Sequence, residues 1–246
     1  MILSAALKES PADLLLTIAW AQEHVTYALE GNILSTGATV EWAAEFLDLG
    51  GGSAEVARLA LGASQGEGVY LVSAFVGLGA PHLDPDARGL LTGLTLSTGA
   101  ADLARAALES IAYQVRDVVE ALDNRLANPI EAIWADGGAT ENDWLMQFQA
   151  DILGRPVLRS LAPEVAALGV VYMAGLAARV WRSTSEIEQL PRPVDRFDPA
   201  MAKAKRNQLY GGWLAAVEQA RGYGRSAVDR QPGTIAGDSR AVGLVR

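Results

Sequence analysis

The sequence contains no cysteine among its 246 residues and only two histidines, His24 and His82. The lack of cysteine excludes disulfides, thiolate nucleophiles and cysteine-based metal sites. Two histidines cannot form a histidine-rich metal cluster, and a Ser–His–Asp triad would have to use one of them. We interpret both as ordinary surface or edge residues.

Positive charge is also scarce, because 20 lysines and arginines face 29 acidic residues and leave a net charge of −9. An acidic chain lacks the electrostatic footprint that nucleic acids and anionic lipids need. A phosphate ligand would therefore draw its positive charge from backbone N–H groups and a metal ion.

Long apolar runs are missing as well. The longest uncharged one, residues 165–178, is shorter than the roughly 20 residues that a membrane-spanning helix needs. The N-terminal apolar stretch is interrupted by Lys8, Glu9, Pro11 and Asp13, unlike a secretion signal. We expect a cytoplasmic protein that binds neither nucleic acid nor a membrane.

The most informative stretch is residues 132–154, AIWADGGATENDWLMQFQADILG. It predicts a buried strand over 133–135, a tight turn over 136–139 and a helix over 141–153 whose apolar residues recur at helical spacing. Gly154 follows the last of these residues, where a helix stop belongs.

Gly137 and Gly138 lie between this strand and this helix. Without Cβ atoms the backbone can approach a ligand closely, and the first N–H groups of the helix point at whatever lies there. A nucleotide is the usual occupant of such a place. The alternative is a plain strand–turn–helix connection in which glycine serves only the backbone angles.

The remaining pattern alternates strands and helices. Strands are expected over residues 14–20, 25–29, 69–75, 90–96 and 156–158. Helices are expected over 40–47 (entered at Gly37), 54–61 (capped by Ser53), 102–122, 164–181 and 198–221. The small residues of 164–181 predict a helix lying close on a sheet. The pattern indicates an α/β domain with helices on both faces of a sheet.

Two glycine-rich places carry no known nucleotide motif. The triplet at residues 50–52 follows a helix rather than a strand and lacks the lysine of a Walker loop. Residues 136–138 do not form a G-x-G-x-x-G fingerprint, which argues against a dinucleotide-dependent oxidoreductase. Residues 222–246 show no periodicity, and we expect a disordered tail there after one domain over 1–221.

Several segments, in order, match motifs of one enzyme family. They include TYALEG (26–31), GLGAPHLDPDARG (77–89), GLLTGLTLSTGAADLARAALE (89–109), DGGATENDWLMQFQADILG (136–154) and ALGVVYMAGLA (167–177). Together they resemble the C-terminal half of the FGGY carbohydrate kinases, most closely the glycerol kinase branch. The resemblance covers roughly residues 14–221.

This resemblance implies an actin-like, ribonuclease H-like ATPase fold with a central mixed sheet flanked by helices. Enzymes of the family transfer the γ-phosphate of ATP to a sugar or polyol hydroxyl with Mg²⁺. The chain resembles only their second, nucleotide-binding domain. The catalytic aspartate and the substrate pocket belong to the missing N-terminal domain, so no catalytic residue or metal ligand is assigned here and the chain alone is expected to be inactive.

By similarity, five positions bind the nucleotide. Gly37 matches a nucleotide-contacting glycine, while Gly138 and Asn142 match the glycine and asparagine that hold the nucleotide at the central turn, with Gly137 beside them. Glu41 stands where glycerol kinases typically have glutamine. The family's GAPYW segment also departs, since residues 79–83 read GAPHL.

Two functions from different classes remain open. The first is the ATP-binding half of a sugar or polyol kinase, completed by a missing domain or by a separate N-terminal chain. The second is a non-catalytic structural or interaction module, in which the exposed cleft face supports a homodimer or binds another partner.

Overall fold

The computed structural model describes residues 2–3, 11–21, 24–63, 68–162 and 164–228. Its strands are β1 (Ile2–Leu3), β2 (Leu15–Ala21), β3 (Val25–Glu30), β4 (Tyr70–Val72), β5 (Leu90–Thr92), β6 (Ile133–Ala135), β7 (Val157–Ser160) and β8 (Val194–Phe197). Its helices are α1 (Gly37–Phe46), α2 (Gly52–Ala60), α3 (Ala100–Asp123), α4 (Asp143–Leu153), α5 (Val165–Ala177), α6 (Thr184–Glu188) and α7 (Lys203–Val228), with a short 3₁₀ turn, η1 (Gly138–Glu141).

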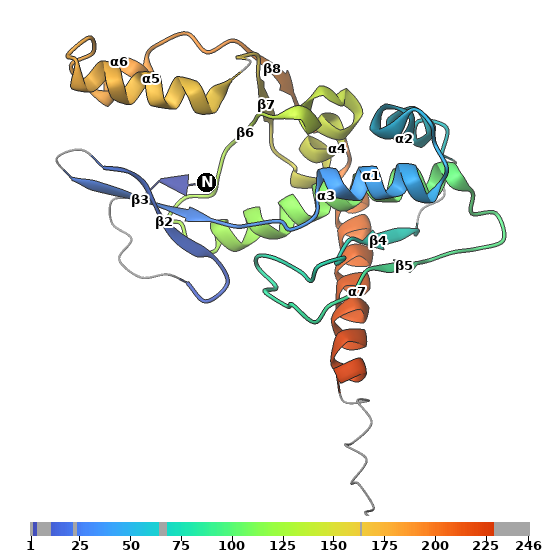
Figure 1. The fold of residues 1–246 in the computed structure, drawn as a ribbon. Coiled ribbons are helices and arrows are strands. Elements are labelled where there is room, and N and C mark those ends of the chain that lie inside the picture. Colours follow the sequence, from blue (N-terminus) through green and yellow to red (C-terminus); the bar gives the residue numbers. More distant parts are fainter. Residues whose placement is uncertain (1, 4–10, 22–23, 64–67, 163, 229–246) are drawn as a thin grey trace, which may run out of the picture.

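The described strands form three small sheets. β1, β3 and β2 pair antiparallel in that order, and β4 pairs antiparallel with β5. In the third sheet the central strand β7 pairs parallel with β6 and antiparallel with β8. The expected mixed sheet is therefore the three-stranded β6–β7–β8 sheet, which α4 contacts, and the other described strands lie outside it (Figure 1).

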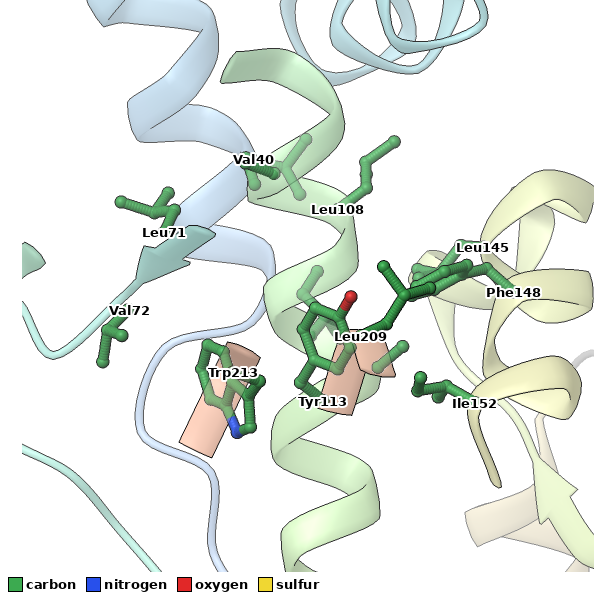
Figure 2. Packing of buried hydrophobic residues seen from close by; sticks show 14 of the residues in the cluster. Val40, Leu71, Val72, Leu108, Tyr113, Leu145, Phe148, Ile152, Leu209 and Trp213 are labelled. Carbon is green, nitrogen blue, oxygen red and sulfur yellow. The ribbon is translucent and has the colours of Figure 1, made fainter. Parts of the chain in front are cut away.

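Helix α3 runs through the centre of the main core (Figure 2). The Tyr113 ring stacks on Trp213 of α7 with ring centroids 5.3 Å apart, and Phe148 of α4 meets it edge-on at 5.6 Å. Each such aromatic pair contributes about 0.5–1.5 kcal/mol beyond its area burial. Tyr113 thereby joins three helices that are far apart in sequence.

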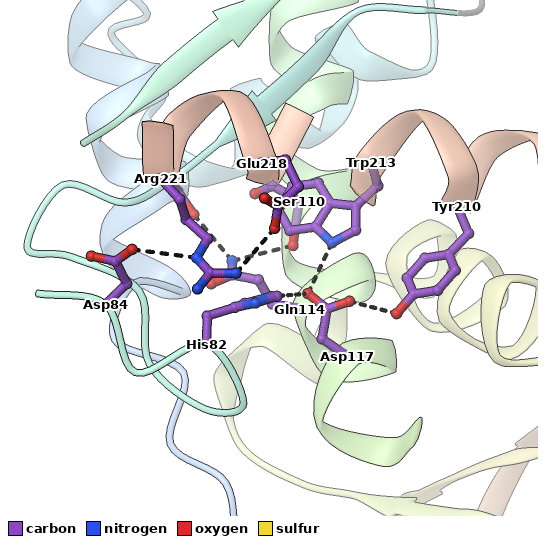
Figure 3. A network of polar contacts seen from close by, with 10 residues as sticks. His82, Asp84, Ser110, Gln114, Asp117, Tyr210, Trp213, Glu218 and Arg221 are labelled. Carbon is purple, nitrogen blue, oxygen red and sulfur yellow. Dashed lines mark hydrogen bonds and ion pairs between the residues drawn. The ribbon is translucent and has the colours of Figure 1, made fainter. Parts of the chain in front are cut away.

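A buried carboxylate reinforces the same junction (Figure 3). Asp117 of α3, which is 4% exposed, accepts hydrogen bonds from Tyr210 Oη at 2.6 Å and Trp213 Nε1 at 2.9 Å. His82 Nε2 lies 3.1 Å from the same carboxylate. These contacts attach α7 and the loop around His82 to the central helix.

Helix α5 corrects one expectation. Its small residues predict a helix pressed onto a sheet, but in the structure only Gly175 of this helix is buried, against the Trp181 ring. Val165, Val170 and Val171 are exposed, and α5 and α6 stand apart from the α3–α4–α7 core in Figure 1. The apolar side chains of α5 therefore remain largely open to solvent.

Other boundaries differ more modestly. The strands expected over 69–75 and 90–96 are each three residues long, and Ser53 lies inside α2, whose N-cap is Gly51. Strand β8 was not expected from the sequence.

The tail expected from Gly222 begins inside α7, which continues to Val228, and residues 229–246 lie outside the described part. No helix in the described chain is long and apolar enough to cross a membrane.

Candidate functional site

The strand–turn–helix unit expected at residues 132–154 is present. β6 leads into Gly137, whose φ of +94° is a backbone conformation that favours glycine. The chain then passes through η1 into α4, which ends at Gly154 with φ +68°, the expected left-handed cap. One detail differs, since Trp134 is 54% exposed and the strand is not fully buried.

Local hydrogen bonds hold the turn. Thr140 donates to the Gly137 carbonyl from its backbone N–H at 3.0 Å and from its hydroxyl at 2.7 Å. The Asn142 side chain accepts from the Leu145 N–H at 3.0 Å, which makes Asn142 the N-cap of α4. An N-cap satisfies one of the amides that the helix leaves without a partner.

A pocket of about 670 Å³ opens against this turn. Gly137 and Gly138 form part of its wall, and Cβ atoms built on either would meet no other atom within 4 Å. Thr140 and Arg159 also line it, as do Val165 and Ala166 at the start of α5. The bare backbone of the glycine pair therefore faces open space that a ligand can enter.

The pocket is strongly acidic. Five of its fourteen lining residues are carboxylates: Asp136, Glu141, Asp143, Glu164 and Asp195. Arg159 is the one basic residue among them. Such a wall repels a bare polyphosphate and accepts a neutral ring, or an anion whose charge is offset by a cation.

Arg159 lies on β7, the central strand of the mixed sheet, and reaches three elements. It donates to the Thr140 carbonyl at 2.8 Å, to Asp143 Oδ1 at 2.6 Å and to Asp195 Oδ2 at 2.6 Å. Hydrogen bonds from Arg159 to Asp195 and then to Asp143 raise the pKa of its guanidinium. The turn, the start of α4 and β8 are thus held together by one side chain.

Of the five expected nucleotide residues, Gly137 and Gly138 line the pocket, and Asn142 follows them along the chain as the N-cap of α4. Gly37 is the first residue of α1 and is exposed. Glu41, one turn further along, lines a different depression of about 490 Å³ together with Glu45 and Asp48. Neither residue of α1 lines the pocket at the glycine turn.

The sequence did not single out Arg159, Thr140 or Asp195. No signal in the sequence connects Arg159 with the glycine turn, because it is one of 17 arginines and lies 21 residues after Gly138. The described residues contain no group of three or more histidines and carboxylates that could hold a metal ion.

Comparison with known proteins places these features in a family. Residues 4–178 match the C-terminal domain of the FGGY family of carbohydrate kinases. The chain belongs to this family. FGGY kinases have the actin-like ATPase fold, so both the resemblance and the fold class inferred from the sequence are confirmed.

Among curated FGGY relatives, glycerol kinase from Thermococcus gammatolerans is 49% identical over 214 residues, and glycerol kinase 2 from Thermotoga maritima is 47% identical over 216. These alignments cover 87% of this chain but only 43% and 44% of the relatives. The chain thus spans less than half the length of the glycerol kinases it matches.

Solved FGGY structures agree with the fold. Plasmodium falciparum glycerol kinase, crystallised with ADP, superposes with a TM-score of 0.76 at 32% identity, covering 84% of this chain and 42% of that one. Xylulose kinase from Lactobacillus acidophilus also gives 0.76, at 22% identity, covering 94% and 45%. At that lower identity the likeness supports the fold alone.

Proposed function

We propose that this chain is the ATP-binding part of a glycerol-type sugar or polyol kinase. Completed by the portion that its longer relatives carry, it would support ATP-dependent phosphorylation of a carbohydrate hydroxyl in the cytoplasm. The observation that carries the proposal is the open pocket against Gly137 and Gly138, where bare backbone adjoins the start of α4. FGGY membership and the ADP-containing relative support it.

In this proposal the nucleotide lies against the glycine turn, and Asn142 keeps the start of α4 in place behind it. The five carboxylates of the pocket suit the uncharged adenosine end better than the phosphates. The phosphates would extend out of the pocket. Gly37 and Glu41 of α1 are further contacts on the family resemblance alone, since neither lines this pocket. Mg²⁺ would be carried mainly by the phosphate oxygens, as is usual for this ion.

The nucleotide-binding domain in this proposal comprises residues 1–221 and the continuation of α7. Phosphoryl transfer depends on positioning, charge stabilisation and an oriented nucleophile. Since the family resemblance assigns the base and the substrate pocket to the N-terminal domain, this chain alone would bind nucleotide without turning over. A separate N-terminal chain would be its natural partner.

Isothermal titration with ADP and Mg²⁺ tests the proposal. The wild type should give a saturable heat, and Gly138→Asp should bind at least about tenfold more weakly, a loss of about 1.4 kcal/mol. A Cβ at Gly138 meets no neighbour, so the fold should tolerate the change. Gly211→Asp, at an equally open glycine on α7, is the matched control. No heat from the wild type, or equal heats from wild type and Gly138→Asp, would contradict the proposal.

One observation favours the second candidate function, an interaction module. The apolar helix α5 exposes Val165, Val170 and Val171, and exposed apolar surface of this kind often marks a contact with another protein. A homodimer through this helix would appear in sedimentation velocity as a concentration-dependent dimer unaffected by ADP. A monomer at all concentrations would remove this candidate.

A further inference from the structure

We infer that Arg159 is a positioning residue that holds the glycine turn in its ligand-binding conformation. The inference rests on the proposed nucleotide function for its meaning. It goes beyond that function because Arg159 is not among the residues matched to the family's nucleotide contacts. Arg159 lies in the pocket wall and acts on the turn through Thr140.

The contacts form a chain from β7 to the glycine pair. Arg159 Nη1 donates to the Thr140 carbonyl at 2.8 Å. Thr140 in turn donates to the Gly137 carbonyl twice, at 3.0 Å from its N–H and at 2.7 Å from its hydroxyl. Gly137 has φ +94°, and glycine visits many other conformations at little cost. The turn therefore depends on outside contacts to keep one shape.

The other half of the guanidinium anchors Arg159 itself. Asp195 Oδ2 of β8 accepts from Nη2 at 2.6 Å and from Nε at 3.2 Å. The guanidinium carbon also lies 5.2 Å from the centre of the Phe197 ring. A planar group held on one edge by a carboxylate can present its remaining N–H groups in fixed directions. This geometry lets the strand β7 set the position of the turn.

Arg159 also has an electrostatic role in the same place. It pairs with Asp143 and Asp195, two of the five carboxylates that line the pocket. Without the guanidinium, both would face an incoming nucleotide uncompensated. The geometric and electrostatic effects can be separated, because charge effects at exposed sites weaken with salt and positioning effects do not.

Three variants test the inference in the full chain. Arg159→Gln removes the planar guanidinium and its positive charge. Arg159→Lys keeps the charge, but a single ammonium group cannot reach Thr140 and Asp195 together. Arg196→Gln is the control, because Arg196 is exposed on neighbouring β8 and pairs with Asp198. The first readout is amide hydrogen exchange of peptides covering residues 137–142, which needs no nucleotide. The second is ADP affinity at low and high salt.

We expect exchange over 137–142 to accelerate at least threefold in Arg159→Gln and in Arg159→Lys, with α3 peptides unchanged and Arg196→Gln like the wild type. ADP should bind at least tenfold more weakly to Arg159→Gln, with a deficit that persists at high salt. Amide exchange rates over 137–142 equal to those of the wild type in both Arg159 variants would overturn the inference. A loss of ADP affinity in Arg159→Gln that disappears at high salt would overturn it as well. If the wild type binds no ADP, the proposed function fails, and the exchange result alone decides the positioning role.

Discussion

The Tyr210 hydroxyl donates a 2.6 Å hydrogen bond to Asp117, 93 residues earlier in the chain. Trp213 Nε1, one turn along α7, donates to the other oxygen of the same carboxylate at 2.9 Å. Asp117 is nearly inaccessible to solvent, so its carboxyl oxygens are hydrogen-bonded by donors of the protein rather than by water. Asp117 therefore adds two hydrogen bonds to the Tyr113–Trp213 ring stacking that also attaches the last helix to the central helix (Figure 3).

Replacing Asp117 by alanine should be strongly destabilising. The change leaves the Tyr210 hydroxyl and the Trp213 N–H without their acceptor in a buried place, and such losses cost about 2–5 kcal/mol together. Urea unfolding would measure the free energy of unfolding. Asp86→Ala, in an exposed loop, is the matched control and should change it by less than about 0.5 kcal/mol. Equal effects of the two substitutions would show that the buried carboxylate is not a stabilising centre.

Two adjacent glycines of α7 should respond in opposite directions to alanine. A Cβ on Gly211 meets no atom within 4 Å, so Gly211→Ala should stabilise the helix by about 0.5–1 kcal/mol. A Cβ on Gly212 would overlap the Tyr70 side chain, so Gly212→Ala should destabilise by about 1–3 kcal/mol. Thermal unfolding of the two variants is the measurement. A shift of both in one direction would contradict this packing of α7 on β4.

Glu109 should make stability depend on pH. Burial raises the pKa of its carboxyl above the usual value of about 4.5, although hydrogen bonds from Arg105 and Tyr113 oppose this rise. The folded protein then holds the Glu109 proton more tightly than the unfolded chain does. This contribution to stability is fully present below pH 4.5 and is lost as the pH rises through the folded-state pKa.

The Glu109→Gln variant isolates that contribution. The free energy of unfolding of the wild type, taken relative to Glu109→Gln, should fall as the pH rises from about 4 to 7. Denaturant titrations of both proteins across this range give the difference. A difference that grows with pH would mean that the Arg105 contact outweighs burial and that the sign of the pKa shift is the reverse.

Asn142 should matter twice, once for stability and once for binding. Asn142→Ala removes the side-chain acceptor for the Leu145 N–H, and the loss of such a cap costs about 1 kcal/mol. Asn142→Asp keeps an acceptor in place and should restore the stability. If the cap positions the nucleotide wall as proposed, Asn142→Ala should also weaken ADP binding severalfold. Undiminished ADP binding by Asn142→Ala would confine this residue to a structural role.

The sequence predicts the glycine turn well because its signals are local. The glycine pair, the capping asparagine and the terminal Gly154 all lie within residues 132–154, the segment that they organise. The long helix α3 is equally well predicted by its periodic apolar residues. In both cases the residues that specify the structure are the residues that form it.

Contacts between distant segments were not predictable in this way. The partners of Arg159 lie 16–36 residues away in sequence, and no spacing rule connects them. The composition of α5 shows that the helix is apolar. It does not show which surface, if any, the helix packs against, and that surface decides whether its side chains are buried. Strand β8 carries two charged residues in four, which hides it from a hydrophobic pattern.

Photoaffinity labelling with an azido derivative of ADP, followed by peptide mapping, would locate the nucleotide on the chain. We expect label in peptides that contain residues 137–142 or 159–166, competed by unlabelled ADP and lost in Gly138→Asp. Label confined to other segments, or label that excess ADP does not displace, would contradict the assignment of the glycine turn as the nucleotide site.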